Sequence, residues 1–137
     1  RLKLLPPLFV AYDNNLSEMS DIMHRKMRER FISGDRKVIE TMECIAHLAE
    51  EGRHCLLKKN WKDFGAKMDK NFDLRRRIFK LSPKHIAMVE TARKFGANVN
   101  FAGSGGAIVG IYRNKKMLDK IIPALSAIDC KVLIPVM

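Results

Sequence analysis

The residues whose types and spacing are best suited to chemistry form a glycine-rich turn. Phe101–Ala107 reads FAGSGGA, with three glycines in four positions. Glycine allows positive φ angles and a close approach of the backbone to a ligand, and successive N–H groups in such a turn can bind an anion. The spacing matches neither a dinucleotide-binding loop nor a Walker A loop. On glycine content alone, an anion-binding turn and a hairpin turn without a ligand both remain open.

Cysteine and histidine do not indicate a metal or catalytic site. Cys44, His47, His54 and Cys55 fall in one predicted helix, which cannot surround an ion tetrahedrally. The four histidines lack a carboxylate or nucleophile at matched spacing, so no catalytic residue is assigned. Three cysteines at wide spacing argue against a disulfide framework and favour the cytoplasm.

Charge and length narrow the function classes further. The 137 residues suit a single domain, residues 1–137, and 47% hydrophobic residues suffice for a core. The formal charge of +11 attracts polyanions, but the basic residues are mixed with acidic ones and are not interleaved with aromatics. This pattern disfavours nucleic acid as the partner. No apolar run approaches the roughly 20 residues of a membrane span, so no membrane partner is expected.

Apolar periodicity and capping residues predict the elements that position the turn. A strand at 8–12 precedes four helices: one capped by Ser17 or Ser20 and stopped by Gly34, and others capped by Asp35, Asn60 and Ser82. The second helix is expected to bury Val38, Met42, Ile45, Ala49 and Leu56. Strands at 99–102 and 107–112 flank the glycines, and a helix opened by Asn114 leads to a strand at 131–136.

The order β-αααα-β-β-α-β predicts an α+β fold. A short turn makes the middle strands an antiparallel hairpin, and each outer strand reaches the hairpin through helices. We therefore expect a ferredoxin-like split β-α-β sandwich. It would have one four-stranded antiparallel sheet, helices on one face and an enlarged helical first crossover.

Residues 96–109 resemble the third motif of the GHMP kinases, the superfamily of galactokinase, homoserine kinase and mevalonate kinase. In that motif a helix ending in Gly-Ala leads to a strand, a G-x-G-G turn and a second strand. Residues 5–8, 48–53 and 71–77 also resemble the C-terminal part of glucuronokinases, which are plant-type sugar-1-kinases. The resemblance covers nearly the whole chain.

The resemblance implies a kinase that uses ATP and Mg²⁺ to phosphorylate a small sugar, first of all glucuronate to glucuronate 1-phosphate. The glycine-rich turn would lie beside the phosphates, so the expected cofactor-binding residues are Gly103, Ser104, Gly105 and Gly106. The expected substrate-binding residues are Asn71, Asp73, Arg75 and Arg76. An arginine there would bind a uronate carboxylate through two hydrogen bonds, although a solvated helix end is the alternative for each arginine.

The chain departs from the family where phosphate is bound. A Pro-x-x-x-Gly-Leu-Gly-Ser-Ser loop is absent from the 137 residues, as is a suitable catalytic Asp and Lys pair. We therefore expect the C-terminal domain of a two-domain enzyme. It would be inactive alone, with the missing N-terminal kinase domain as partner and an apolar surface that favours self-association. The alternatives are a non-catalytic ferredoxin-like module that binds nucleic acid or a small regulatory ligand, and a pseudo-kinase domain that mediates assembly.

Overall fold

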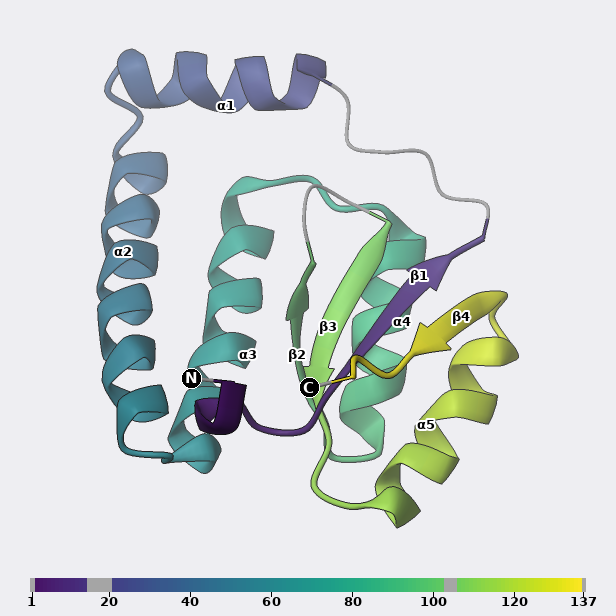
Figure 1. Cartoon of the computed structure of the whole chain (residues 1–137). Helices are drawn as coiled ribbons and strands as arrows, with labels where there is room; N and C mark the ends of the chain where they lie inside the picture. The colour runs from purple at the N-terminus through teal and green to yellow at the C-terminus, as the bar shows by residue number, and fades with distance from the viewer. Residues whose placement is uncertain (1, 15–20, 103–105, 137) are drawn as a thin grey trace.

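Within the residues that it describes, the computed structural model contains five α-helices and four strands in the order expected from the sequence (Figure 1). The structure describes residues 2–14, 21–102 and 106–136. Its elements are a 3₁₀ turn η1 (Leu2–Leu4), β1 (Leu8–Asp13), α1 (Asp21–Ile32), α2 (Arg36–Leu57), α3 (Trp61–Ile78), α4 (Pro83–Lys94), β2 (Asn98–Phe101), β3 (Ala107–Ile111), α5 (Lys115–Ser126) and β4 (Cys130–Leu133).

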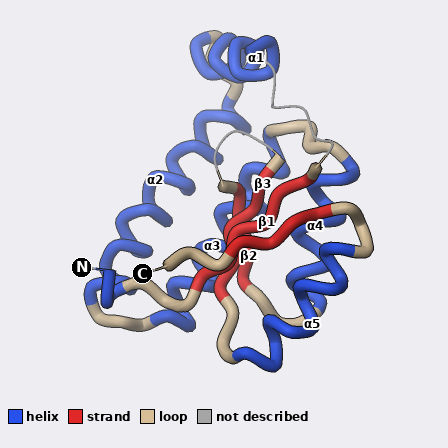
Figure 2. The backbone as a smooth tube through the Cα atoms, turned by 45° about the vertical axis from the view of Figure 1, so that its right-hand side comes forward, coloured by secondary structure: helices blue, strands red, loops and turns tan. Residues whose placement is uncertain are grey.

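The four strands form one antiparallel sheet in the order β2-β3-β1-β4. Ala11 at the centre of β1 pairs with Ile108 of β3 on one side and with Val132 of β4 on the other. Helices α3, α4 and α5 lie along the sheet, which is drawn in red in Figure 2. The ferredoxin-like α+β fold is confirmed, with α1 to α4 as the enlarged crossover between β1 and β2.

Local capping explains where the helices begin. The side chains of Asp35, Asn60, Ser82 and Asn114 accept hydrogen bonds from backbone N–H groups of the first helical turn. All four predicted caps are confirmed. The predicted caps Ser17 and Ser20 lie outside the described residues.

The core lies between the sheet and helices α3, α4 and α5. Its wholly buried side chains come from β1, β2, β3 and all three helices, and they include Phe9, Val99, Ile108, Phe72, Met88 and Ile121. On each strand, alternate residues point into this core. Their neighbours point to the opposite face of the sheet, which no other strand or sheet covers in the described part of the chain.

Two predictions about individual elements are wrong in part. The buried face of α2 runs through Val38, Thr41, Leu48 and Gly52, whereas Ala49 is exposed. Thr41 and Gly52 carry little hydrophobic signal, so apolar periodicity alone could not reveal this face. The last strand ends at Leu133 rather than at residue 136, because Pro135 cannot donate to a ladder and β1 is preceded by prolines.

Helix α1 stands apart from the sheet and packs on α2 (Figure 1). A small cluster of Met27, Val38 and Ile78 holds it. Arg30 adds an ion pair with Asp35 at 3.0 Å and a hydrogen bond to the Ile78 carbonyl at 2.9 Å. This cluster is separate from the main core between the sheet and α3, α4 and α5.

Candidate functional site

A hollow opens between α2, α3 and the sheet face opposite the core. Its larger part holds about 440 Å³, and an adjoining part holds about 250 Å³. The two parts share Leu5, Phe64, Met68 and Asn100, so we treat them as one site, the α2–α3 hollow. Its walls are mostly apolar, and its polar residues are Arg53, Lys67, Asn71 and Asn100. This combination of size and lining is typical of small-molecule sites.

One of the four predicted substrate-binding residues, Asn71, lines this hollow, and a second, Arg75, is hydrogen-bonded to it. Arg75 Nε donates to Asn71 Oδ1 at 2.7 Å from one turn further along α3. Arg75 is half-buried and has no carboxylate partner in the described part of the chain. The bond to Asn71 orients the guanidinium while its remaining N–H groups stay available.

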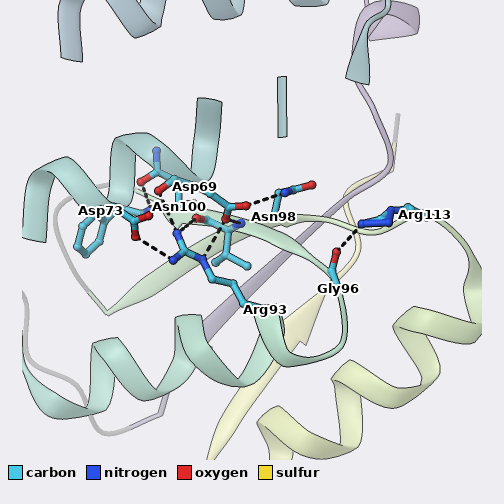
Figure 3. Close-up of polar contacts among 9 residues, drawn as sticks. Asp69, Asp73, Arg93, Gly96, Asn98, Asn100 and Arg113 are labelled. Carbon is cyan, nitrogen blue, oxygen red and sulfur yellow. Dashed lines mark hydrogen bonds and ion pairs between the residues drawn. The ribbon is translucent and has the colours of Figure 1, made fainter. Parts of the chain in front are cut away.

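The other two predicted substrate-binding residues lie elsewhere. Asp73 accepts a hydrogen bond from Arg93 Nη1 at 2.9 Å, on the side of α3 that faces α4 (Figure 3). Arg76 is exposed. Helical geometry accounts for the separation, because residues four apart share a face and residues two apart do not. Neither residue lines the α2–α3 hollow.

An ion-pair cluster fixes α3 against β2 and so sets the position of the hollow's walls. Asp69 Oδ1 lies 3.0 Å from Arg93 Nε and accepts from the Val99 N–H at 2.9 Å. Asp69 Oδ2 accepts from Asn98 Nδ2 at 2.6 Å, and the Arg93 guanidinium stacks 5.1 Å from the centre of the Phe72 ring. Figure 3 shows Arg93 of α4 reaching between Asp69 and Asp73.

The glycine-rich turn joins the end of β2 to the start of β3. Gly103, Ser104 and Gly105 fall outside the described residues. The Ala102 N–H donates to the Ala107 carbonyl at 3.1 Å and closes the hairpin that the sequence predicts. Gly106 has a φ of +79°, which favours glycine, and its carbonyl accepts from the Asp13 N–H at 2.9 Å. Binding of a cofactor by this turn stays a prediction.

A buried histidine supports both ends of this turn from the core side, a placement that the sequence analysis missed. His85 Nε2 lies 3.4 Å from the Ala107 carbonyl oxygen, and its ring meets Phe101 edge-on at 4.6 Å. Because His85 lies three residues before Met88 and four before Val89, both buried, helical periodicity could have placed it on the inner face of α4.

Two charged residues lie next to this histidine. Asp13 ends β1 with its side chain almost fully buried, and its Oδ1 lies 3.6 Å from Lys84 Nζ. Lys84 also donates to the Ile128 carbonyl. Burial lowers the pKa of His85 below its ordinary value of 6.5, against the opposing effects of the Ala107 carbonyl and the Asp13 charge. His85 is therefore neutral in the folded protein at neutral pH.

This lowered pKa makes stability depend on pH. Below pH 6.5 the unfolded chain protonates His85 more readily than the folded chain does. The contribution of His85 to the free energy of unfolding is therefore fully present above that pH, and it is lost as the pH drops through the folded pKa. We expect the urea midpoint to fall more steeply for the wild type than for His85→Gln between about pH 7.5 and about pH 5. His47→Gln, at an exposed position, is the control and should follow the wild type. Equal slopes for all three proteins would contradict the assignment.

Within the described residues, no group of three or more His, Cys, Asp or Glu side chains is placed to hold a metal ion. None of the described helices combines the length and apolar character that crossing a membrane requires.

Comparison with known proteins identifies relatives of this chain by sequence. Residues 53–129 match the family model "GHMP kinases C terminal". The chain is 47% identical over 111 residues to "Probable glucuronokinase 2" and 43% identical to "Glucuronokinase 1", both from Arabidopsis thaliana. Each match covers 79% of this chain and 30% of the relative, so the chain spans about a third of the length of these relatives.

Solved structures agree on the fold. The L. major mevalonate kinase, solved in complex with R-mevalonate, matches with a TM-score of 0.80 at 20% identity, over 90% of this chain and 39% of that chain. The Methanococcus jannaschii mevalonate kinase matches with a TM-score of 0.73 at 22% identity, over 93% and 38%. The resemblance seen in residues 96–109 is thus confirmed by sequence and by fold, and the chain belongs to the GHMP kinase C-terminal family.

Proposed function

We propose that this chain is the C-terminal domain of an ATP-dependent sugar kinase whose substrate is glucuronate and whose product is glucuronate 1-phosphate. The observation that carries the proposal is the 47% identity to a probable glucuronokinase over 79% of the chain. The three cysteines are free, which is compatible with the cytoplasmic location expected from the sequence.

The geometry of the α2–α3 hollow supports a sugar acid as substrate. Its apolar walls suit the body of a sugar ring, and Asn71 and Asn100 offer amide groups for hydroxyls. Arg75, oriented by Asn71, would bind the carboxylate. In the kinase, Asp73 would hold α3 against α4 through its ion pair with Arg93 and would not contact the sugar. Arg76 would lie in solvent.

The remaining parts of the reaction belong to a second domain. Mg²⁺-bound ATP supplies the γ-phosphoryl group, and positioning and neutralisation of charge dominate catalysis of such transfers. We assign the binding of Mg²⁺ and most of the nucleotide to an N-terminal kinase domain that packs on the open sheet face. The turn at residues 103–106 would approach the phosphates from this chain. Leu133 and Ile134, 55% and 42% exposed, would be covered by that domain.

The substrate assignment is tested on the whole protein that carries this chain. ATP-dependent phosphorylation is measured with glucuronate, galacturonate, galactose and arabinose. We expect turnover to be highest with glucuronate, and Arg75→Gln to raise the KM for both uronates about tenfold while leaving the neutral sugars unchanged.

The control variant is Arg77→Gln, an exposed arginine two positions along the same helix. It should behave as the wild type. If Arg75→Gln turns over glucuronate with an unchanged KM, Arg75 does not bind the substrate. That result would not affect the kinase assignment. A folded protein that turns over none of the four sugars would contradict the assignment of glucuronate as the substrate.

A further inference from the structure

A second hollow lies at the opposite end of the hairpin from the glycine-rich turn. It holds about 640 Å³, and we call it the basal hollow. Its lining comes from the residue before β1, the first turns of α3, the start of β2, and the end of β3 with the two residues that follow it: Pro7, Trp61, Lys62, Ala66, Asn98, Ile111, Tyr112 and Arg113. The four residues of β2 alone separate it from the turn by on the order of 10 Å. It is therefore distinct from the turn, and it shares no lining residue with the α2–α3 hollow.

The walls of the basal hollow are apolar, aromatic and held in place. Trp61 Nε1 donates to the Leu4 carbonyl at 2.9 Å, which orients the indole ring. Ile111 is 6% exposed. Helix α3 packs directly on the start of β2 here, because a Cβ on Gly65 would lie 2.2 Å from Asn98 Oδ1. These contacts define the shape of the hollow before any ligand arrives.

The charges of the basal hollow are all of one sign. Lys62 and Arg113 are exposed at its edge, and the eight lining residues include no acid. Arg113 is anchored by a hydrogen bond to the Gly96 carbonyl at 3.0 Å (Figure 3). Neither cation has a carboxylate partner within the described ranges. The nearby acid Asp69 is already engaged by Arg93 and Asn98.

From this combination we propose that the basal hollow binds a small anionic ligand that joins a flat, apolar ring to a carboxylate or a phosphate. The ring would lie against Trp61, Tyr112 and Ile111, and the anion would meet Lys62 and Arg113. Apolar burial supplies affinity, while the two cations select the charge. The volume falls within the roughly 300–1,000 Å³ of small-molecule sites.

The sole tryptophan of the chain reports directly on this site. The indole N–H signal of Trp61 is followed by ¹H–¹⁵N NMR while benzoate, benzamide, phenyl phosphate or inorganic phosphate is added to the chain up to about 10 mM. Benzoate and benzamide have nearly the same shape and differ in charge. We expect benzoate and phenyl phosphate to shift the indole signal. Benzamide and inorganic phosphate should bind more weakly by about tenfold or by a larger factor.

Variants locate the charge. Lys62→Gln combined with Arg113→Gln should weaken benzoate and phenyl phosphate about tenfold and leave benzamide unchanged. Lys70→Gln, an exposed lysine of α3 outside the lining, is the matched control and should have little effect. Ala66→Leu should fill the hollow and reduce binding of every ring compound. The dispersion of each spectrum shows whether the variant is folded.

Three results would overturn the proposal. The first is no shift of the Trp61 signal with any anion in a folded chain. The second is equal affinity for benzoate and benzamide, which would mean that charge is not recognised. The third is an equal loss of anion binding in Lys70→Gln and in the double variant, which would mean that the net charge of the chain, not this hollow, attracts the anion.

Discussion

Gly110→Ala is expected to lower the free energy of unfolding by about 3 kcal/mol, near the upper end of what overpacking a core costs. Gly110 of β3 pairs across the sheet with Phe9 of β1, whose side chain is wholly buried. A Cβ at residue 110 would lie 2.3 Å from Phe9 Cζ and 2.4 Å from Cε1. Because core atoms surround the ring, it has no space into which to turn.

The measurement is urea-induced unfolding followed by circular dichroism, with Gly52→Ala as the control. A Cβ on Gly52, inside α2, would lie 3.5 Å from Phe64, an ordinary contact distance. Since alanine favours a helix more than glycine does, Gly52→Ala should be neutral or stabilise by up to about 1 kcal/mol. If Gly110→Ala is as stable as the wild type, the packing of Phe9 on β3 is wrong.

Arg93→Ala is expected to lower the free energy of unfolding by about 2 kcal/mol, the second large effect. It removes the ion pairs with Asp69 and Asp73 and the stacking on Phe72, and it leaves Asp69 without its cation. The side chains of Arg93 and Asp69 are 25% and 28% exposed, so the cost should stay below that of a fully buried pair.

The same unfolding measurement on Arg36→Ala provides the comparison. Arg36 forms an ion pair with Glu40 at 3.5 Å, but both side chains are largely exposed and Arg36 begins α2, where a positive charge is unfavourable. This variant should lie within about 0.5 kcal/mol of the wild type. Equal effects of Arg93→Ala and Arg36→Ala would show that the cluster does not hold α3 to β2.

Features that depend on neighbouring residues could be predicted from the sequence. The caps Asp35, Asn60, Ser82 and Asn114 act within one helical turn, and the hairpin needs only two apolar runs around glycines. The split β-α-β arrangement with one antiparallel sheet then followed from the connections between elements. These local rules were enough to predict the fold. Together with the resemblance of residues 96–109, they also predicted the family.

Features that depend on distant contacts could not be predicted. Asp73 pairs with Arg93, which is 20 residues away on another helix, and no local pattern in the sequence indicates that contact. The basal hollow joins residues as far apart in the sequence as Pro7 and Arg113. The inner face of α2 includes Gly52, which carries no hydrophobic signal. Asn100 was expected only as part of a strand, yet it lines the α2–α3 hollow because α3 packs beside β2. Such placements follow from tertiary packing alone.

The most direct test of the central claim, that this chain is the C-terminal domain of a glucuronate kinase, is to exchange it into a relative. In Glucuronokinase 1 of Arabidopsis thaliana, the region that matches 111 residues of this chain is replaced by the corresponding residues, and ATP-dependent phosphorylation of glucuronate is measured. We predict turnover within about tenfold of the parent, and none by this chain alone. A folded exchange protein that binds ATP but does not phosphorylate glucuronate would contradict the claim.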